Sequence, residues 1–383
     1  MNAQQRIVLG ITSASHALIH ICELSVPPLL VLLQREFSAT DFELGQVVGL
    51  YGLLYGLGAL PAGVLVDRIG SKRLLIACLW GASCSLLGMA WAPSLGWFAV
   101  CAAGMGLSLS VYHPAGTSLI THHLPAEARV FAIHGMAGSF GVAGASAIAG
   151  VLGALWGWRW ALTLVALPGL LLGGRVLALK SRRVEEIRAQ RGHIRWRHLA
   201  LLLGAAGFMG MVYRGMTTFL PKLFAVSYGR DVSSGVALGG LLTTGALLVG
   251  MAGMYASGRI SDAGRHPAGV FFLGAIAQGP LLVAMAYLSG PSLVPLAMGV
   301  AFFHFWTQPV GNQLVAQLTP PNARGVGYGA YFFLAFGAGS AGAGLSGWVS
   351  DAFGLAYIFP VLACLLLPSA LGVLVLRRLR PLR

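Results

Sequence analysis

The chain has 383 residues, of which 57% are hydrophobic and only 9% are charged. A soluble domain of ordinary composition carries roughly 25% charged residues, so this composition excludes such a domain and indicates a protein whose outer surface faces lipid. The net charge of +14 comes from basic residues in short segments between apolar runs, which is typical of membrane orientation and argues against nucleic-acid binding.

Twelve apolar segments follow one another along the chain, each at least as long as the roughly 20 residues that a helix needs to cross a bilayer. They cover residues 8–33, 43–66, 74–93, 96–121, 129–154 and 159–180, then 198–225, 234–257, 267–289, 292–317, 325–349 and 355–376. The sequence therefore predicts an all-α, multi-pass membrane protein. We expect a six-helix bundle at residues 1–180, a basic cytoplasmic linker at 181–197 and a second six-helix bundle at 198–383.

The basic residues between these segments are distributed unevenly. If the N-terminus is cytoplasmic, most of the 25 lysines and arginines fall in cytoplasmic segments, and Arg35, Arg159, Lys222 and Arg230 fall on the other side. Cytoplasmic loops of membrane proteins carry such an excess of positive charge. We therefore expect both termini to be cytoplasmic and the protein to lie in the cell membrane.

Glu23 is the one acidic residue, of eleven in the chain, that falls inside a predicted span. A charged group at that depth is costly unless it faces a partner or a cavity, so it indicates a functional site. His16 and His20 precede it at the spacing that places all three side chains on one face of a helix. We interpret this stripe as a proton-coupling group. A hydrogen-bonded packing contact and a transition-metal site, completed by methionines of the seventh span, are the alternatives.

Arg214 is the matching basic residue, near the middle of the seventh span. A buried guanidinium needs a carboxylate or phosphate partner. That partner could be Glu23, an anionic substrate, or each in turn, and competition between them would couple protonation to transport. A structural bond to backbone carbonyl groups is the alternative.

The two halves of the sequence match each other at an offset of 195 residues. Residues 113–129 (HPAGTSLITHHLPAEAR) align without gaps to residues 308–324 (QPVGNQLVAQLTPPNAR), and Gly63 and Asp67 align to Gly258 and Asp262. Repeated halves of this kind are typical of secondary transporters, which bind their substrate near the bilayer midplane between the repeats.

The segment GVLVDRIGSKR at residues 63–73 resembles the loop signature of the major facilitator superfamily, and GRISDAGRH at 258–266 is similar to its weaker second copy. The matching residues are Gly63, Asp67, Arg68, Gly70, Lys72 and Arg73, with Gly258 and Asp262 in the second copy. We interpret them as a gating motif in which Gly63 lets two helices approach closely and Asp67 pairs with a basic group or a helix N-terminus.

The resemblance also implies which residues face the substrate. In this family the first, fourth, seventh and tenth helices line a central cavity, so the expected substrate-binding residues besides Arg214 are Tyr112, His113, His304, Trp306, Gln308 and Asn312. Among subfamilies, SASHALIH (13–20), YHPAGTSLI (112–120) and TTFLPKLF (217–224) are most similar to the fosmidomycin-resistance group of exporters. That similarity implies drug efflux, whereas the fifth helix lacks the Gly-Pro pair of the family's antiporter motif.

We therefore expect a monomeric secondary transporter of a small polar or anionic organic solute, working by proton-coupled efflux and alternating access. Uptake of an organic anion, or of a transition metal through His16, His20 and Glu23, is the alternative. The expected partners are the substrate, protons and lipid, with neither a cofactor nor a resident metal. A membrane-embedded enzyme is disfavoured because the sequence has no HExxH, Gx5GK[ST] or GxSxG motif, and a channel is disfavoured by the two repeated halves.

Overall fold

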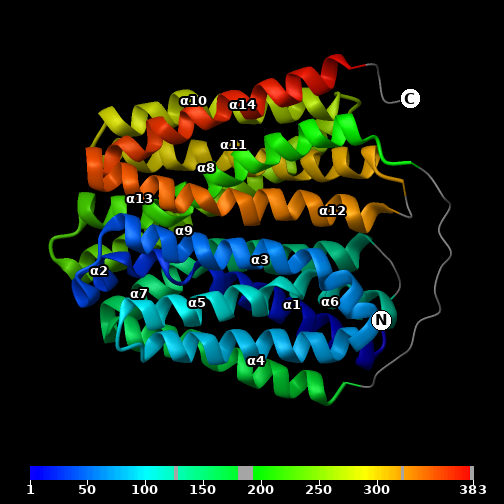
Figure 1. Ribbon diagram of the computed structural model, residues 1–383, viewed down its shortest axis with the longest axis horizontal. Helices are drawn as coiled ribbons and strands as arrows, with labels where there is room; N and C mark the ends of the chain where they lie inside the picture. Colours follow the sequence, from blue (N-terminus) through cyan, green and yellow to red (C-terminus); the bar gives the residue numbers. More distant parts are fainter. Residues whose placement is uncertain (125–127, 180–192, 321–322, 380–383) are drawn as a thin grey trace.

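The computed structural model describes residues 1–383 apart from 125–127, 180–192, 321–322 and 380–383. Most of the predicted linker at 181–197 therefore lies outside the described residues. Within the described residues every regular element is helical, and the long helices run side by side (Figure 1). The prediction of an all-α protein is confirmed.

The helices of the first part of the chain are α1 (Ala3–Leu24), η1 (Pro27–Leu29), α2 (Leu30–Phe37), α3 (Asp41–Ile69), α4 (Ser71–Ala90), α5 (Leu95–Ser110), α6 (Tyr112–His123) and α7 (Ala128–Leu177). Those of the second part are α8 (Trp196–Tyr228), α9 (Val232–Asp262), α10 (Pro267–Tyr287), η2 (Gly290–Ser292), α11 (Leu293–Leu318), α12 (Arg324–Phe332), η4 (Phe333–Gly337), η5 (Ala338–Ser340), α13 (Ala341–Phe353), η6 (Leu355–Tyr357) and α14 (Ile358–Arg378).

Eleven continuous helical segments of the described chain are long and apolar enough to cross a membrane. One of them, α7, has 50 residues and would extend about 75 Å at 1.5 Å per residue, which is more than twice the thickness of a bilayer core. Gly157 interrupts it with a φ of 81°, a left-handed conformation that favours glycine. Since α7 therefore contributes two spans, the described part of the chain has twelve, as the sequence predicts.

Several spans are broken where they pass the centre of the molecule. The first is broken between α1 and α2 at Pro27 and Pro28, and the fourth between α5 and α6 at Val111, just before Pro114. Proline cannot donate the backbone hydrogen bond that continues a helix. The eleventh span contains the π-helical turn η4, a distortion that is frequent at functional sites.

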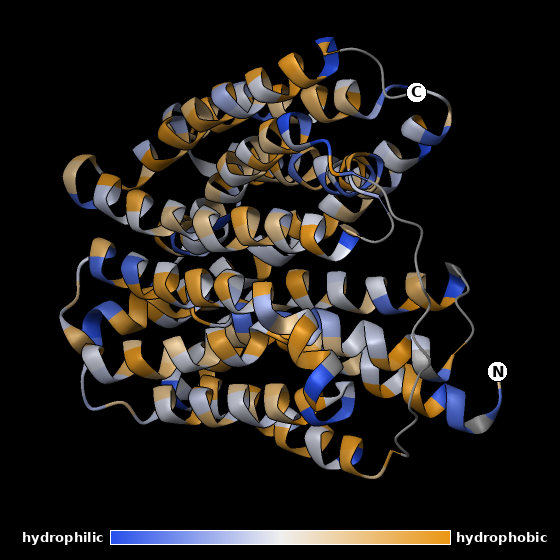
Figure 2. Ribbon diagram, turned by 45° about the vertical axis from the view of Figure 1, so that its right-hand side comes forward, coloured by the Kyte–Doolittle hydropathy of each residue, from blue (hydrophilic) through white to orange (hydrophobic). Residues whose placement is uncertain are grey.

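Helices α1–α7 lie on one side of the molecule and α8–α14 on the other (Figure 1). Glycines let the two sets approach each other: a Cβ on Gly240 of α9 would lie 2.2 Å from the carbonyl oxygen of Ser146 on α7, and one on Gly56 of α3 would lie 2.3 Å from the Cα of Gly337 in η4. Hydrophilic residues gather mainly at the helix ends and hydrophobic residues along their lengths, as expected for a protein embedded in lipid (Figure 2).

The expectation that Gly63 permits a close approach of two helices is wrong for this structure. A Cβ on Gly63 would meet no atom within 4 Å, and the same holds for Gly258. The close approaches of α3 to the second set of helices are at Gly45, Gly52 and Gly56, which face Ala343, Ser340 and Gly337.

Candidate functional site

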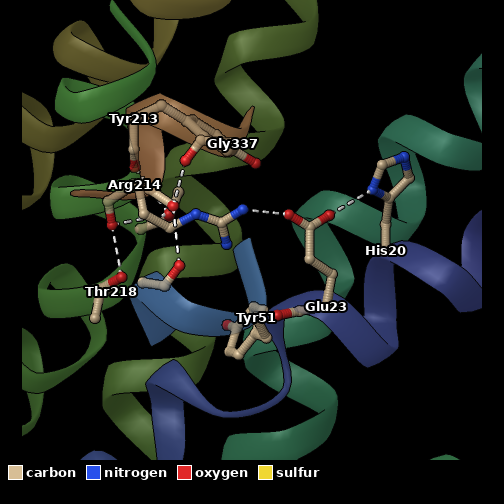
Figure 3. A network of polar contacts seen from close by, with 10 residues as sticks. His20, Glu23, Tyr51, Tyr213, Arg214, Thr218 and Gly337 are labelled. Carbon is tan, nitrogen blue, oxygen red and sulfur yellow. Dashed lines mark hydrogen bonds and ion pairs between the residues drawn. The ribbon is translucent and has the colours of Figure 1, made fainter. Parts of the chain in front are cut away.

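An ion pair between Glu23 of α1 and Arg214 of α8 lies at the centre of the molecule. The Nη2 atom of Arg214 is 2.6 Å from Oε1 of Glu23, and the two residues are only 1% and 2% exposed (Figure 3). The two partners come from opposite sets of helices, so the pair joins the two sides of the molecule. The sequence singled out both residues, and the structure brings them into direct contact.

Hydrogen bonds to the backbone carbonyls anchor both charged residues. Tyr51 of α3 donates a hydrogen bond of 2.8 Å to the backbone carbonyl of Glu23, and its ring centre lies 5.7 Å from Cζ of Arg214. The Thr218 hydroxyl donates to the backbone carbonyl of Arg214 at 2.6 Å. Among the described residues, the Nη1 atom of Arg214 is buried with no hydrogen-bond partner. The guanidinium therefore has donors to spare for a second acceptor.

The two histidines of α1 make different contacts, and only one of them reaches Glu23. The Nδ1 atom of His20 is 3.1 Å from Oε2 of Glu23, so His20, Glu23 and Arg214 form one chain of contacts. His16 does not reach Glu23: its Nδ1 atom lies 2.8 Å from the carbonyl oxygen of His134 on α7. The predicted stripe therefore divides into His20, which contacts the carboxylate, and His16, which contacts the neighbouring helix.

A cavity of about 90 Å³ lies beside this centre, against the second set of helices. Five of its thirteen lining residues are Phe or Tyr, and a few amide and hydroxyl groups could orient a ligand. The lining residues are Ala206, Met209, Gly210, Tyr213, Phe271, His304, Thr307, Gln308, Asn312, Tyr331, Phe332, Ala335 and Phe336. Arg214 follows Tyr213 directly on α8, while its own side chain is not among those that line the cavity.

Three of the predicted substrate-binding residues line this cavity: His304, Gln308 and Asn312. Trp306 does not, because it lies on another face of α11 and its indole donates to the carbonyl of Val270 at 2.9 Å. Tyr112 is fully buried and donates to the carbonyl of Thr12 at 2.6 Å, which makes it a contact between α6 and α1.

His113 lies next to Tyr112 but faces the opposite set of helices. Its ring is stacked on Phe332, with the ring centres 6.2 Å apart. Since Phe332 lines the cavity, His113 lies near the cavity from the side of α6.

The predicted gating motif lies at the junction of α3 and α4. Gly70 has a φ of 92° and forms the turn, and the ammonium group of Lys72 donates to the carbonyls of Leu177 and Leu179 at 2.8 and 2.6 Å. A cation at the C-terminus of a helix is favourable because the free carbonyls there carry partial negative charge.

The other motif residues make fewer contacts. Arg68, Arg73 and Asp262 are exposed, and the side chain of Asp67 lies outside the described residues. The pairing expected for Asp67 therefore stays a prediction.

Sequence reasoning missed a second group of charges that joins the two sets of helices. The ammonium group of Lys222 on α8 lies 2.5 and 2.7 Å from the carboxylate oxygens of Asp41 at the start of α3, and Ser350 of α13 donates to the same carboxylate at 2.6 Å. Asp351 accepts from the backbone amides of Asp41 and Phe42 at 3.0 and 2.8 Å. We call Asp41, Lys222, Ser350 and Asp351 the closed-end cluster.

The closed-end cluster lies at one end of the bundle. The first helix begins, and α14 ends, at the opposite end (Figure 1). Among the described residues, no ion pair joins the two sets of helices at that opposite end. The one sequence signal for the cluster was the pair of opposite charges at predicted helix ends on the same side of the membrane, and many surface residues share that property.

Comparisons with known proteins agree with this architecture. The sequence profile of a family described as the Major Facilitator Superfamily matches residues 12–343. The probable L-galactonate transporter of Escherichia coli strain K12 is 25% identical over 62% of this chain, and the match covers 57% of that relative. The 4-hydroxybenzoate transporter PcaK of Pseudomonas putida is 25% identical over 89% of this chain and 84% of its own length.

A solved structure supports the fold alone, because its sequence identity is low. The crystal structure of a bacterial homolog of the human lysosomal transporter Spinster, in an inward-facing and unoccupied conformation, superposes with a TM-score of 0.83 at 17% identity. The superposition covers 99% of this chain and 98% of the other.

Proposed function

The chain belongs to the Major Facilitator Superfamily, and from that premise we propose that it carries a small organic anion across the membrane together with a proton. The fold and the relatives identify the chain as a multi-pass membrane protein and a secondary transporter of small molecules. The substrate class, the coupling ion and the direction are the proposal.

The single observation that carries the proposal is the buried ion pair between Glu23 and Arg214. An anionic substrate needs a positive charge, and Arg214 is neutralised while Glu23 is ionised. Protonation of Glu23 releases the guanidinium, which can then bind the anion through charge-assisted hydrogen bonds. Proton and anion therefore favour each other's binding, and by thermodynamic linkage the effect is reciprocal.

That linkage has a direction. Two ligands that promote each other's binding move together, which is symport, and an inward proton gradient then drives uptake.

The efflux expected from the resemblance to fosmidomycin-resistance exporters would require the opposite: a cationic or hydrogen-bond-donating substrate that competes with the proton for Glu23. We keep proton-coupled efflux as the second candidate, since such a substrate could displace Arg214 from Glu23. Of the described residues that line the cavity, only His304 carries an imidazole and none carries a carboxylate or a thiolate, so transition-metal cargo is the weaker alternative.

The substrate class that fits best is a carboxylic acid with a flat or aromatic body. The cavity beside Arg214 is lined by Tyr213, Phe271, Tyr331, Phe332 and Phe336, and aromatic rings pack favourably against one another. Two relatives are named as transporters of organic acids, galactonate and 4-hydroxybenzoate. Gln308 and Asn312 supply amide groups for hydroxyl or carbonyl substituents.

Alternating access would proceed by rocking of the two six-helix bundles, 1–180 and 198–383, about the central pair. We place the protein in the cell membrane as a monomer with both termini in the cytoplasm, which puts the closed-end cluster on the outer side. The state described here is then closed to the outside, and Lys72 with the rest of the motif between α3 and α4 lies on the inner side.

The test is uptake of radiolabelled 4-hydroxybenzoate and galactonate into proteoliposomes that hold the purified full chain. We expect accumulation when the outside is more acidic than the inside, and its loss when a protonophore is added. Antiport predicts the reverse sign, with uptake driven by an acidic interior. Substrate movement that ignores both gradients would contradict proton coupling altogether.

Glu23→Gln separates binding from coupling, because glutamine is neutral like the protonated acid. We expect this variant to exchange labelled for unlabelled substrate across the membrane while it no longer accumulates substrate in a pH gradient. Arg230→Ala, an exposed arginine in the loop before α9, is the control and should behave like the original protein. Loss of exchange in Glu23→Gln with normal folding would contradict the proposed role.

A further inference from the structure

Four histidines from three helices gather in the first set of helices, beside the ion pair but outside the cavity lining described above. The ring centre of His16 lies 5.1 Å from that of His20, 5.3 Å from that of His113 on α6 and 4.3 Å from that of His134 on α7. One ring nitrogen from each of His16, His20 and His113 lies within 4.8 Å of the others. Neither the family fold nor the proposed anion transport requires such a cluster.

The hydrogen bonds of two of these rings fix which nitrogen can bind a ligand. The Nδ1 atom of His16 lies 2.8 Å from the carbonyl oxygen of His134, and a carbonyl can only accept, so Nδ1 carries the hydrogen. The Nδ1 atom of His20 faces a carboxylate oxygen of Glu23 at 3.1 Å. In a neutral ring the lone pair is then on Nε2, and within the described chain no hydrogen bond occupies either Nε2.

This pattern is the one found around protein-bound metals. A histidine that ligates a metal almost always donates its other ring N–H to a carboxylate or to a backbone carbonyl, which orients the ring and increases its basicity. Here His20 has the carboxylate and His16 has the carbonyl. Both acceptors are themselves held in place, Glu23 by Arg214 and the carbonyl of His134 by the backbone of α7.

We propose that His16, His20 and His113 form a binding site for a divalent transition-metal ion such as Zn²⁺. Zinc sites with three imidazole ligands and one open position are common, with Zn–N distances of about 2.0–2.1 Å. Ligand atoms of such a tetrahedron lie about 3.4 Å apart, so two nitrogens at the upper limit of 4.8 Å would need to approach each other by roughly 1.4 Å. The inference goes beyond the proposed function and does not depend on it.

The ligand set differs from the one that the sequence suggested. Spacing along α1 grouped His16 and His20 with Glu23 as possible ligands. In the structure the third member of the group is His113 of α6, and Glu23 instead contacts the Nδ1 atom of His20. Gly138 also belongs to the site, because a Cβ there would lie 2.4 Å from a ring carbon of His16. The ring of His16 therefore sits directly against the backbone of α7.

The test is titration of the purified full chain, in lipid nanodiscs and without a polyhistidine tag, with Zn²⁺ and Co²⁺. We expect one equivalent of Zn²⁺ to bind, and His16→Ala and His113→Ala each to weaken it by tenfold or more. Glu23→Gln should weaken it by about tenfold, which is typical when a group that supports a ligand is changed. His304→Ala, a buried histidine in the opposite set of helices, is the matched control and should bind like the original protein.

A second measurement covers variants that fail to fold. The Co²⁺ complex of the unaltered protein should show the intense visible bands of a four-coordinate site, and zinc X-ray absorption should show imidazole ligands. The proposal is overturned if the unaltered protein binds no saturable equivalent of either metal. It is also overturned if the bound metal has no imidazole ligands, or if folded His16→Ala and His113→Ala bind as tightly as the His304→Ala control.

Discussion

Charged residues inside the spans are the most informative single residues of this chain. Glu23 and Arg214 could be identified from the sequence, because a charge at that depth is costly and rarely present without a function. Their direct contact was one of the alternatives that the sequence left open. The sequence could not decide between them, because the contact joins side chains 191 positions apart and depends on how α1 and α8 pack. For the same reason the sequence grouped Trp306 with the cavity, whereas the rotation of α11 turns its indole toward α10.

The first prediction concerns the energetics of the ion pair. Arg214→Gln leaves Glu23 as a buried charge without its partner, and removing one member of a buried pair costs about 3–5 kcal/mol of stability. We expect this variant to lose transport and to unfold at a clearly lower temperature. The double variant Glu23→Gln with Arg214→Gln has no uncompensated charge and should regain most of the stability but no proton-driven uptake.

Thermal unfolding of the single and double variants in the same detergent measures this coupling as a double-mutant cycle. Additive effects of the two substitutions on stability would show that the contact between Glu23 and Arg214 contributes nothing, and would contradict the prediction.

Glycines determine how closely whole helices approach, and the sequence shows their number but not their partners. It placed a close approach at Gly63, where the structure has open space, and gave no sign that Gly240 of α9 meets α7. The number of spans could be predicted because hydropathy is a local property. The break at Gly157 falls in the gap between the predicted spans 129–154 and 159–180, so the sequence placed it correctly. The π-helical turn of η4 had no signal in the sequence.

Two glycines of α9 make a matched pair for the second prediction. A Cβ on Gly240 would lie 2.2 Å from a backbone oxygen of α7, whereas one on Gly245 would meet nothing within 4 Å. We expect Gly240→Ala to destabilise the protein by about 1–3 kcal/mol through overpacking. Gly245→Ala should be neutral or stabilising by about 0.5–1 kcal/mol, because alanine is the better helix former.

Melting temperatures of the two variants, measured side by side, check this. Equal values for Gly240→Ala and Gly245→Ala would mean that α7 and α9 are not in contact at this point.

The third prediction concerns the closed-end cluster, which ties α3 to α8 and α13. Lys222→Met removes a charge-assisted hydrogen bond, and such bonds contribute about 1.5–3 kcal/mol. We expect the two sets of helices to separate more often at this end. Spin labels at positions 94 and 289, in the loops before α5 and before η2, should report longer distances by pulsed electron resonance.

Arg230→Ala serves as the control at the same end, because Arg230 is exposed and lies outside the cluster. Identical distance distributions for Lys222→Met and this control would contradict the role of the cluster in closing the molecule.

At the scale of the whole molecule, the fold followed from hydropathy and from the repeat, since both are properties of long stretches of sequence. The fourth prediction is topology: basic residues concentrated on one side place both termini in the cytoplasm. A green fluorescent protein fused to the C-terminus should fluoresce, and alkaline phosphatase fused there should be inactive. Active phosphatase at that position would reverse the assignment of inner and outer sides.

The contact between Glu23 and Arg214 also suggests which forms of the carrier can be occluded. With Glu23 ionised and no substrate, the two charges cancel. With Glu23 protonated and the proposed anion bound to Arg214, they would cancel again. A proton alone would leave a bare guanidinium in a dry interior, and an anion alone would leave an excess negative charge, and both are costly. Electroneutrality of the occluded centre would then prevent uncoupled movement of the proton or the anion. Only the empty and the fully loaded carrier are neutral at this centre, so only these two forms would change between the inward-facing and outward-facing states.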